Sequence, residues 1–111
     1  MFLNIEELKT VATREVIDLI TNSDNTIVEE IIAESIDVMS SYLYKYYDAD
    51  VIFAQVDDAR SKIVLKYLKD IVIHEIYIRR TRQMNEVAKI RYDEAMIWLE
   101  KMAKGEIEAN L

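Results

Sequence analysis

Residues that help a chain reverse direction are almost absent from this sequence, which contains one glycine and no proline among 111 residues. Strand-rich folds depend on tight turns, and tight turns favour these two residue types. Helices need neither residue inside their length. The chain is also long enough to bury a core as one domain. The sequence therefore predicts an all-α fold, a compact bundle of four to five helices in a single domain over 1–111.

The most apolar stretch, between Ile63 and Ile78, contains 11 apolar or tyrosine residues among 16. On a helix these side chains cover most of the circumference, which indicates burial on several sides. Charged residues interrupt the run, and it is shorter than the roughly 18 apolar residues that a membrane span needs. We therefore expect no membrane contact. We predict instead a long central helix over about 56–80, whose surplus apolar residues, including Ile73 and Ile76, pack against neighbours.

Periodic apolar residues predict further helices on both sides of the central one. Short helices are expected at 5–9 and 14–20, and a longer one at 26–47. The last long helix is expected over about 83–104. It stops at Gly105, because a glycine directly after a helix suits the left-handed turn that ends it.

Apolar and aromatic side chains outside the core stripes are candidates for contacts with other proteins. Four tyrosines lie within six residues at the end of the helix over 26–47. Tyrosine is enriched at interfaces, which favours a contact surface; packing of the rings on the next loop is the alternative explanation. The link at 48–55 is too apolar for a free loop, so we expect it to lie against the bundle or against a neighbour. Two isoleucines of the last helix lie opposite its core stripe, either as scattered surface residues or as half of a subunit contact. The candidate interface residues are Tyr42, Tyr44, Tyr46, Tyr47, Ile52, Phe53, Ile73, Ile76, Ile90 and Ile97.

Charge is distributed unevenly over a chain whose net charge is −7. Residues 1–55 contain 11 acids and 3 bases, whereas residues 56–111 contain 10 acids and 11 bases. The asymmetry suggests contacts between surfaces of opposite sign, or simply two differently solvated faces. The acidic candidates are Glu29, Glu30, Glu34 and Asp37, and the basic contact cluster consists of Arg79, Arg80 and Arg82. Stabilisation of a helix C-terminus by cations explains the basic cluster equally well.

Side chains for catalysis or metal binding are scarce. The sequence has no cysteine and a single histidine, which excludes thiolate sites and any site with two imidazoles. His74 is followed by Glu75, but adjacent positions of a helix point apart, so we expect no dyad between them. There is no glycine-rich loop for phosphate. The sequence thus predicts neither an enzyme nor a bound cofactor or metal ion.

The last predicted helix carries a recognisable motif. Arg91–Gly105 reads RYDEAMIWLEKMAKG and resembles the R-Y-x-x-A-x-x-W-L-x-x-[IM]-A-x-G ending of a family of small helical tailed-phage proteins. Members of this family occur in Mu-like phages and prophages and are similar to head–tail connector (adaptor) proteins. Further landmarks of the family are matched, in the same order, by segments 5–8, 16–21, 42–47 and 69–77. Members usually carry proline after the tyrosine landmark, and its absence here predicts a different shape for the link at 48–55.

The resemblance implies a structural protein of the virion neck, made in the host cytoplasm. Such connectors resemble rings, commonly of twelve copies, between the portal protein and the tail or a second neck-ring protein. DNA passes through the lumen without sequence-specific binding, and the acidic residues of 29–37 would repel it there. A ring contact joins two different patches on each subunit. The ends at 1–4 and 106–111 are expected to be able to change state on assembly.

A small regulatory or protein-binding module of phage origin, absent from the virion, is the alternative. It would dock its partner through the tyrosine-rich end of the helix over 26–47. An acidic mimic of DNA would need carboxylates along a long exposed stripe, and residues 29–37 offer only a short one. Copy number separates the first two interpretations, because purified particles should contain a connector at a ring-like level and no regulator.

Overall fold

The computed structural model describes residues 2–11, 14–21, 25–80, 85–109 and 111. These residues form helices and the loops between them, with no strand, and the predicted all-α fold is confirmed. The elements in chain order are α1 (Ile5–Val11), α2 (Arg14–Thr21), α3 (Asn25–Leu43), α4 (Ala49–Ala54), a 3₁₀ turn (Asp57–Ala59), α5 (Lys62–Arg80) and α6 (Glu86–Lys104).

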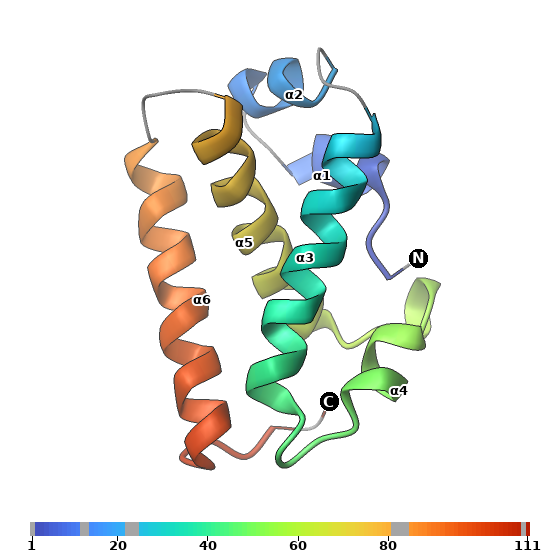
Figure 1. The fold of residues 1–111 in the computed structure, drawn as a ribbon, viewed down its shortest axis with the longest axis vertical. Coiled ribbons are helices and arrows are strands. Elements are labelled where there is room, and N and C mark those ends of the chain that lie inside the picture. The colour runs from blue at the N-terminus through green and yellow to red at the C-terminus, as the bar shows by residue number, and fades with distance from the viewer. Residues whose placement is uncertain (1, 12–13, 22–24, 81–84, 110) are drawn as a thin grey trace.

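Three long helices, α3, α5 and α6, run side by side and form the body of the bundle (Figure 1). The two short helices α1 and α2 lie across one end, and α4 lies beside α3. The most central element is α5, which contacts α2, α3 and α6. The molecule measures 38 × 27 × 19 Å along its principal axes. Among the described residues, no helix is both long and apolar enough to cross a bilayer.

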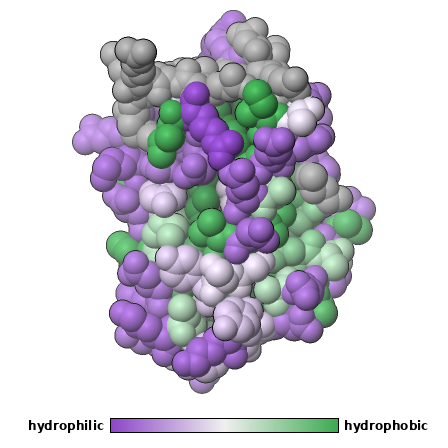
Figure 2. All heavy atoms as spheres, in the orientation of Figure 1, coloured by the Kyte–Doolittle hydropathy of each residue, from purple (hydrophilic) through white to green (hydrophobic). Residues whose placement is uncertain are grey.

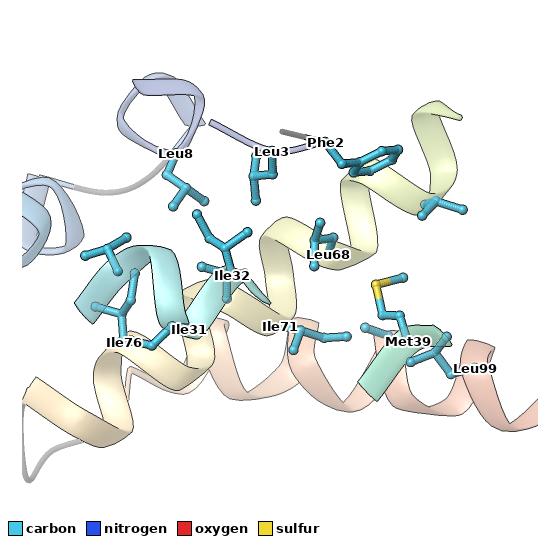
Figure 3. Packing of buried hydrophobic residues seen from close by; sticks show 14 of the residues in the cluster. Phe2, Leu3, Leu8, Ile31, Ile32, Met39, Leu68, Ile71, Ile76 and Leu99 are labelled. Carbon is cyan, nitrogen blue, oxygen red and sulfur yellow. The ribbon is translucent and has the colours of Figure 1, made fainter. Parts of the chain in front are cut away.

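The core lies between the three long helices and is closed by the N-terminal segment. Figure 3 shows side chains of α3, α5 and α6 meeting there, with residues from the start of the chain lying over them. The largest fully buried side chains are Tyr77, Phe2, Leu3, Leu8, Ile20, Ile31, Ile32, Met39, Leu43, Leu68, Ile76 and Leu99. Burying a side chain of this size contributes about 1.5–3 kcal/mol relative to leaving it exposed. Most of these buried residues belong to the periodic apolar positions that predicted the helices.

The central helix begins six residues later than the predicted start at 56. Asp57 adopts a left-handed conformation (φ 52°) within the 3₁₀ turn, and this backbone does not continue into a helix. The Ser61 hydroxyl accepts a hydrogen bond from the Val64 N–H (3.5 Å) and caps α5, which begins at Lys62. Asp57 and Asp58 fall within the predicted helix, whereas in the structure they belong to the 3₁₀ turn and the serine that follows them is the cap.

The N-terminal segment is hydrogen-bonded to the loop that precedes α5. Phe2 and Leu3 are 2% and 0% exposed. The Arg60 guanidinium donates hydrogen bonds to the Phe2 carbonyl (2.9 Å) and to the Glu7 carboxylate (2.7 Å). The hydrogen bond from Arg60 holds the pKa of Glu7 below its usual value. Phe2 and Leu3 are thus packed in the single chain, whereas Asn4 is exposed, and a change of state of this end on assembly stays a prediction.

The third helix ends at Leu43, four residues before the predicted end at 47. Tyr44–Tyr47 form a turn instead. Asp48 caps the next helix by accepting a hydrogen bond from the Val51 N–H (3.3 Å), so the predicted link at 48–55 is largely the helix α4. Ile52 of this link is buried, which shows that the link lies against the bundle, as expected.

The last helix is bounded by two local signals. Asn85 accepts a hydrogen bond from the Ala88 N–H (3.1 Å) at its start, and Gly105 is left-handed (φ 72°) at its end, as the sequence predicts. Residues 83–84, where the helix was expected to begin, lie outside the described residues. Beyond Gly105, the Tyr47 hydroxyl bonds both the N–H and the carbonyl of Ala109 (3.1 Å each), which fastens the C-terminal segment to the end of α3.

Candidate interaction surfaces

The histidine of the central helix takes part in helix packing. The His74 ring stacks on Tyr92 of α6, with centroids 3.7 Å apart and planes 13° from parallel. Its Nδ1 lies 3.4 Å from Oε1 of Glu75, so the expectation that these neighbours point apart was wrong. The glutamate side chain is long enough to fold back, but the contact is longer than a usual hydrogen bond. Burial raises the pKa of the Tyr92 hydroxyl.

Ligands for a metal ion do not gather in the part of the chain that the structure describes. No group of three or more histidine, aspartate or glutamate side chains there is placed to hold an ion. In Figure 2, hydrophilic side chains cover much of the face on which α3 lies, and apolar patches interrupt them near its middle.

The acidic candidates all lie on α3 and are all exposed. Glu30, Glu34 and Asp37 are spaced four and three residues apart, so they share one face of the helix, and we call them the acidic stripe. Val38, which follows directly, is 41% exposed. Glu29 is exposed on a neighbouring face of the same helix.

One member of the basic cluster holds two helices together. Arg79 of α5 forms an ion pair with Glu34 of α3. Both side chains are substantially exposed, so this pair contributes at most about 1 kcal/mol. The side chain of Arg80 and the whole of Arg82 lie outside the described residues. The structure therefore places only Arg79, and it places it in a contact within the chain.

The four tyrosines do not act as one surface. Tyr44 and Tyr46 are 73% and 52% exposed. Tyr42 and Tyr47 are half-buried and pack against the core. Both interpretations of the cluster thus apply, each to two of its members. One exposed ring, Tyr44, and one half-buried ring, Tyr47, border a shallow depression of about 570 Å³ between the end of α3 and the start of α4. The depression is lined by Ser40, Ser41, Tyr44, Tyr47, Asp48, Ala49 and Asp50.

The apolar interface candidates separate into buried and exposed groups. Ile76 and Ile52 are 1% and 7% exposed, so they belong to the core of the chain itself and are not available on this surface. Ile73 is half-buried and packs against that core. Phe53 is also half-buried and makes an edge-to-face contact with Phe2, with ring centroids 5.0 Å apart. Most of the surplus apolar width of α5 is filled by the same chain, whereas Ile63 and Ile78 stay 38% and 54% exposed.

The outer face of α6 remains open. Ile90 and Ile97 are 51% and 52% exposed, and Val87, which the sequence analysis did not single out, is 55% exposed. We call these three residues the apolar face of α6. The buried residues of this helix lie on its other side, against α3 and α5, and include Ala95 and Leu99.

A groove along α5 and α6 was missed by sequence reasoning. It has a volume of about 490 Å³, and we call it the basic groove, lined by Lys62, Leu65, Lys66, Lys69, Asp70, Ile73 and Arg91. Lys66 lies 3.5 Å from the Asp70 carboxylate and 4.2 Å from the centre of the Tyr67 ring. Burial raises the pKa of Asp70, and Lys66 partly offsets this effect. Lys66 and Lys69 interrupt the apolar run of the sequence, and Lys62 precedes it. Their spacing of four and three residues places all three on one helix face.

Comparison with known proteins identifies a family. Neither the curated proteins nor the solved structures contain a match to the chain. The family model described as Bacteriophage Mu, Gp36 matches residues 3–111, which include every helix described above. The resemblance to proteins of Mu-like phages is thereby confirmed at the level of the family. The chain belongs to the bacteriophage Mu Gp36 family.

Proposed function

We propose that the chain is a non-enzymatic head–tail connector subunit of a Mu-like phage. Copies of it form a ring, twelve by resemblance, between the portal protein and the tail or a second neck-ring protein. The DNA channel runs through the ring. One observation carries the proposal: a member of this phage family presents unlike patches on different helices, the acidic stripe on α3 and the basic groove on α5 and α6. Closed rings of identical subunits require such pairs of unlike patches.

The apolar face of α6 and the exposed tyrosines supply contacts of another kind. Val87, Ile90 and Ile97 are each more than half exposed on one helix. Exposed apolar groups of this kind mark binding sites when they are contiguous. Tyr44 and Tyr46 add aromatic surface at the end of α3. In a neck, these patches face the layers above and below the ring.

The net charge of −7 is compatible with a channel that conducts DNA. Negative subunits repel the phosphate backbone and allow it to slide without being held. The acidic residues of α3 have two uses in such a ring, because they can line the lumen or contact the neighbouring subunit. The arrangement of the basic groove favours the second use for the acidic stripe, and Glu29 then stays free for the lumen.

Quantification of the protein in purified phage particles tests the proposal. Mass spectrometry with labelled peptide standards should find the chain at about the copy number of the portal protein in the same particles. Images of the neck should show density for a helical ring next to the portal. Absence of the chain from particles would contradict a connector. That result would favour a regulatory module that docks a partner through the end of α3 at Tyr44 and Tyr46.

A further inference from the structure

Two rows of opposite charge in this chain have the same spacing. Lys62, Lys66 and Lys69 of α5 are separated by four and three residues, and so are the residues of the acidic stripe on α3. Because a helix rises 1.5 Å per residue, each row is about 10 Å long. Residues at this spacing share a helix face. The two rows therefore have the same length and the same order of spacings from the N- to the C-terminal end of their helices. Their charges are opposite.

The basic groove offers more than lysines. Arg91 of α6 adds a fourth cation, and Asp70 is the one carboxylate among the residues that line it. Lys62, Lys69 and Arg91 form no ion pair with the side chains that the structure describes. Apolar parts of Leu65 and Ile73 also line the groove. A complementary partner is therefore a helix with acidic side chains in a row and an apolar group beside them.

The acidic stripe has this composition. Glu30 and Asp37 are exposed and form no ion pair with described side chains, and Glu34 keeps only the exposed pair with Arg79. Val38 supplies an exposed apolar group at the end of the row. The stripe and the groove lie on different helices, and neither is occupied by the other within one chain.

Nucleic acid fits the groove less well than a second copy does. The acidic stripe matches the lysine row in its spacing and is present on every copy of the chain. The rest of this acidic chain also repels DNA. A contact between stripe and groove joins unlike patches, so it repeats from one copy to the next and closes a ring when the rotation allows.

We propose that the acidic stripe of one subunit docks in the basic groove of the next and forms the lateral contact of the ring. The proposal rests on the proposed function for its setting in the phage neck. The contact itself is a property of the purified chain. The proposed contact assigns Glu30, Glu34 and Asp37 to the subunit interface, with Val38, at the end of the row, placed against Ile73.

Cross-linking tests whether the two surfaces meet. The chain has no cysteine, so single-cysteine variants report single positions. Ala33→Cys lies exposed on α3 beside the stripe and leaves its charges intact, and Lys66→Cys lies in the groove. The two variants are mixed up to millimolar concentration and treated with a short bismaleimide. We expect more heterodimer than from the control mixture of Lys66→Cys with Glu100→Cys, which is exposed on α6. Equal yields at all concentrations would overturn the proposal.

Charge reversal tests whether the charges drive the contact. Lys62→Glu/Lys69→Glu reverses the groove, and Glu30→Lys/Asp37→Lys reverses the stripe. Each is expected to weaken association of the full chain, measured by sedimentation or by cross-linking yield, by about tenfold or more. A mixture of the two variants restores association, because each then offers a patch complementary to the other. Raising the salt concentration from about 0.1 M to about 1 M should weaken the wild-type contact, because screening shortens from about 10 Å to about 3 Å.

Matched controls carry the same changes of net charge at other exposed positions. They are Lys45→Glu/Lys104→Glu and Glu100→Lys/Glu106→Lys. If they weaken association as much as the reversals do, net charge and not a specific contact is responsible, and the proposal is wrong. Circular dichroism melting curves confirm that each variant folds.

The remaining outcomes separate this proposal from the connector function and from a nucleic-acid site. If the cross-link forms but the chain is absent from particles, the lateral contact stands and the connector function fails. If the chain occurs in particles at ring-like copy number but the mixed variants do not recover association, the connector function stands and the docking proposal fails. A labelled DNA duplex is titrated in parallel. Loss of duplex binding in Lys62→Glu/Lys69→Glu, with association of copies unchanged, would assign the groove to nucleic acid and overturn the proposal.

Discussion

The two long helices α5 and α6 both carry more apolar residues than one packing contact requires, and they use the surplus in opposite ways. Ile76 of α5 is 1% exposed, whereas Ile97 of α6 is 52% exposed. The difference comes from position in the bundle. Helices α2, α3 and α6 surround α5, whereas α6 contacts α3 and α5 on one side only. The number of apolar residues on a helix thus does not show whether their partners lie in the same chain.

Charged residues show the same contrast between the two helices. Lys66 and Asp70 on α5 have the same spacing as Lys89 and Asp93 on α6. The Asp70 side chain is 11% exposed and that of Asp93 is 53% exposed. Even the polar positions of α5 are therefore partly covered. For both helices, we expect the largest loss of stability where the substituted side chain is most completely buried.

Replacing Ile76 by alanine should destabilise the fold more than any other change considered for these helices. The side chain is fully buried, so its truncation leaves a cavity and costs about 2–5 kcal/mol of unfolding free energy. Urea denaturation followed by circular dichroism measures the loss. Ile97→Ala is the matched control on α6 and should change stability by less than about 0.5 kcal/mol. Equal losses in the two variants would refute the contrast between the helices.

Replacing Gly105 by alanine should destabilise the end of α6. Its φ of 72° is unfavourable for residues with a Cβ atom, and an added Cβ would lie 3.1 Å from the Tyr46 ring. The left-handed conformation alone costs roughly 1–2 kcal/mol. The same urea experiment measures the effect, and Ala103→Gly, two residues earlier, reports the cost of about 1 kcal/mol for the reverse exchange inside the helix. If stability does not change, the end of α6 is less strictly fixed than the buried body of α5.

Replacing Asp70 by asparagine should produce a pH-dependent change in stability. Burial raises the folded-state pKa of Asp70 above its unfolded value. Proton binding to Asp70 therefore stabilises the folded state when the pH is below the pKa of this residue in the unfolded state. This stabilisation is lost as the pH rises through the pKa of Asp70 in the folded state. Asp70→Asn should gain stability relative to the wild type as the pH rises from about 3 to 7.

Unfolding free energies of both proteins across this pH range provide the measurement. Asp93→Asn removes the equivalent ion pair on α6 and is the control for loss of the pair itself. The quantity compared is the unfolding free energy of Asp70→Asn minus that of the wild type. If it does not change with pH, or falls as the pH rises, the carboxylate on α5 is better solvated than its 11% exposure indicates.

Local signals in the sequence were sufficient for some of these features and not for others. The stop at Gly105 depends on one residue and its neighbours, so it was predicted correctly. The start of α5 also has a local signal, the Ser61 cap, but the preceding aspartates were read as helix residues. The basic groove was visible as the spacing of Lys62, Lys66 and Lys69, which sequence reasoning did not use.

The packing of the helices against one another decides which of the remaining apolar and aromatic side chains are buried. Sequence periodicity shows that Ile76 and Ile97 lie outside a simple core stripe, but it does not show which helices surround them. Ile76 is covered by its own chain, and Ile97 is not. The four tyrosines divide for the same reason, because the C-terminal segment reaches Tyr47 and leaves Tyr44 exposed. Such contacts depend on residues distant in the sequence, and no local pattern reports them.

The apolar face of α6 gives the smallest expected effect on stability and a larger one on assembly. Ile90→Ser/Ile97→Ser alters two residues that are more than half exposed, so unfolding free energy should change by less than about 0.5 kcal/mol per site. If this face contacts another layer of the neck, incorporation into particles should fall sharply. Ile78→Ser is the matched control, because Ile78 is 54% exposed on α5. Normal incorporation of the double variant would show that no partner covers the apolar face of α6.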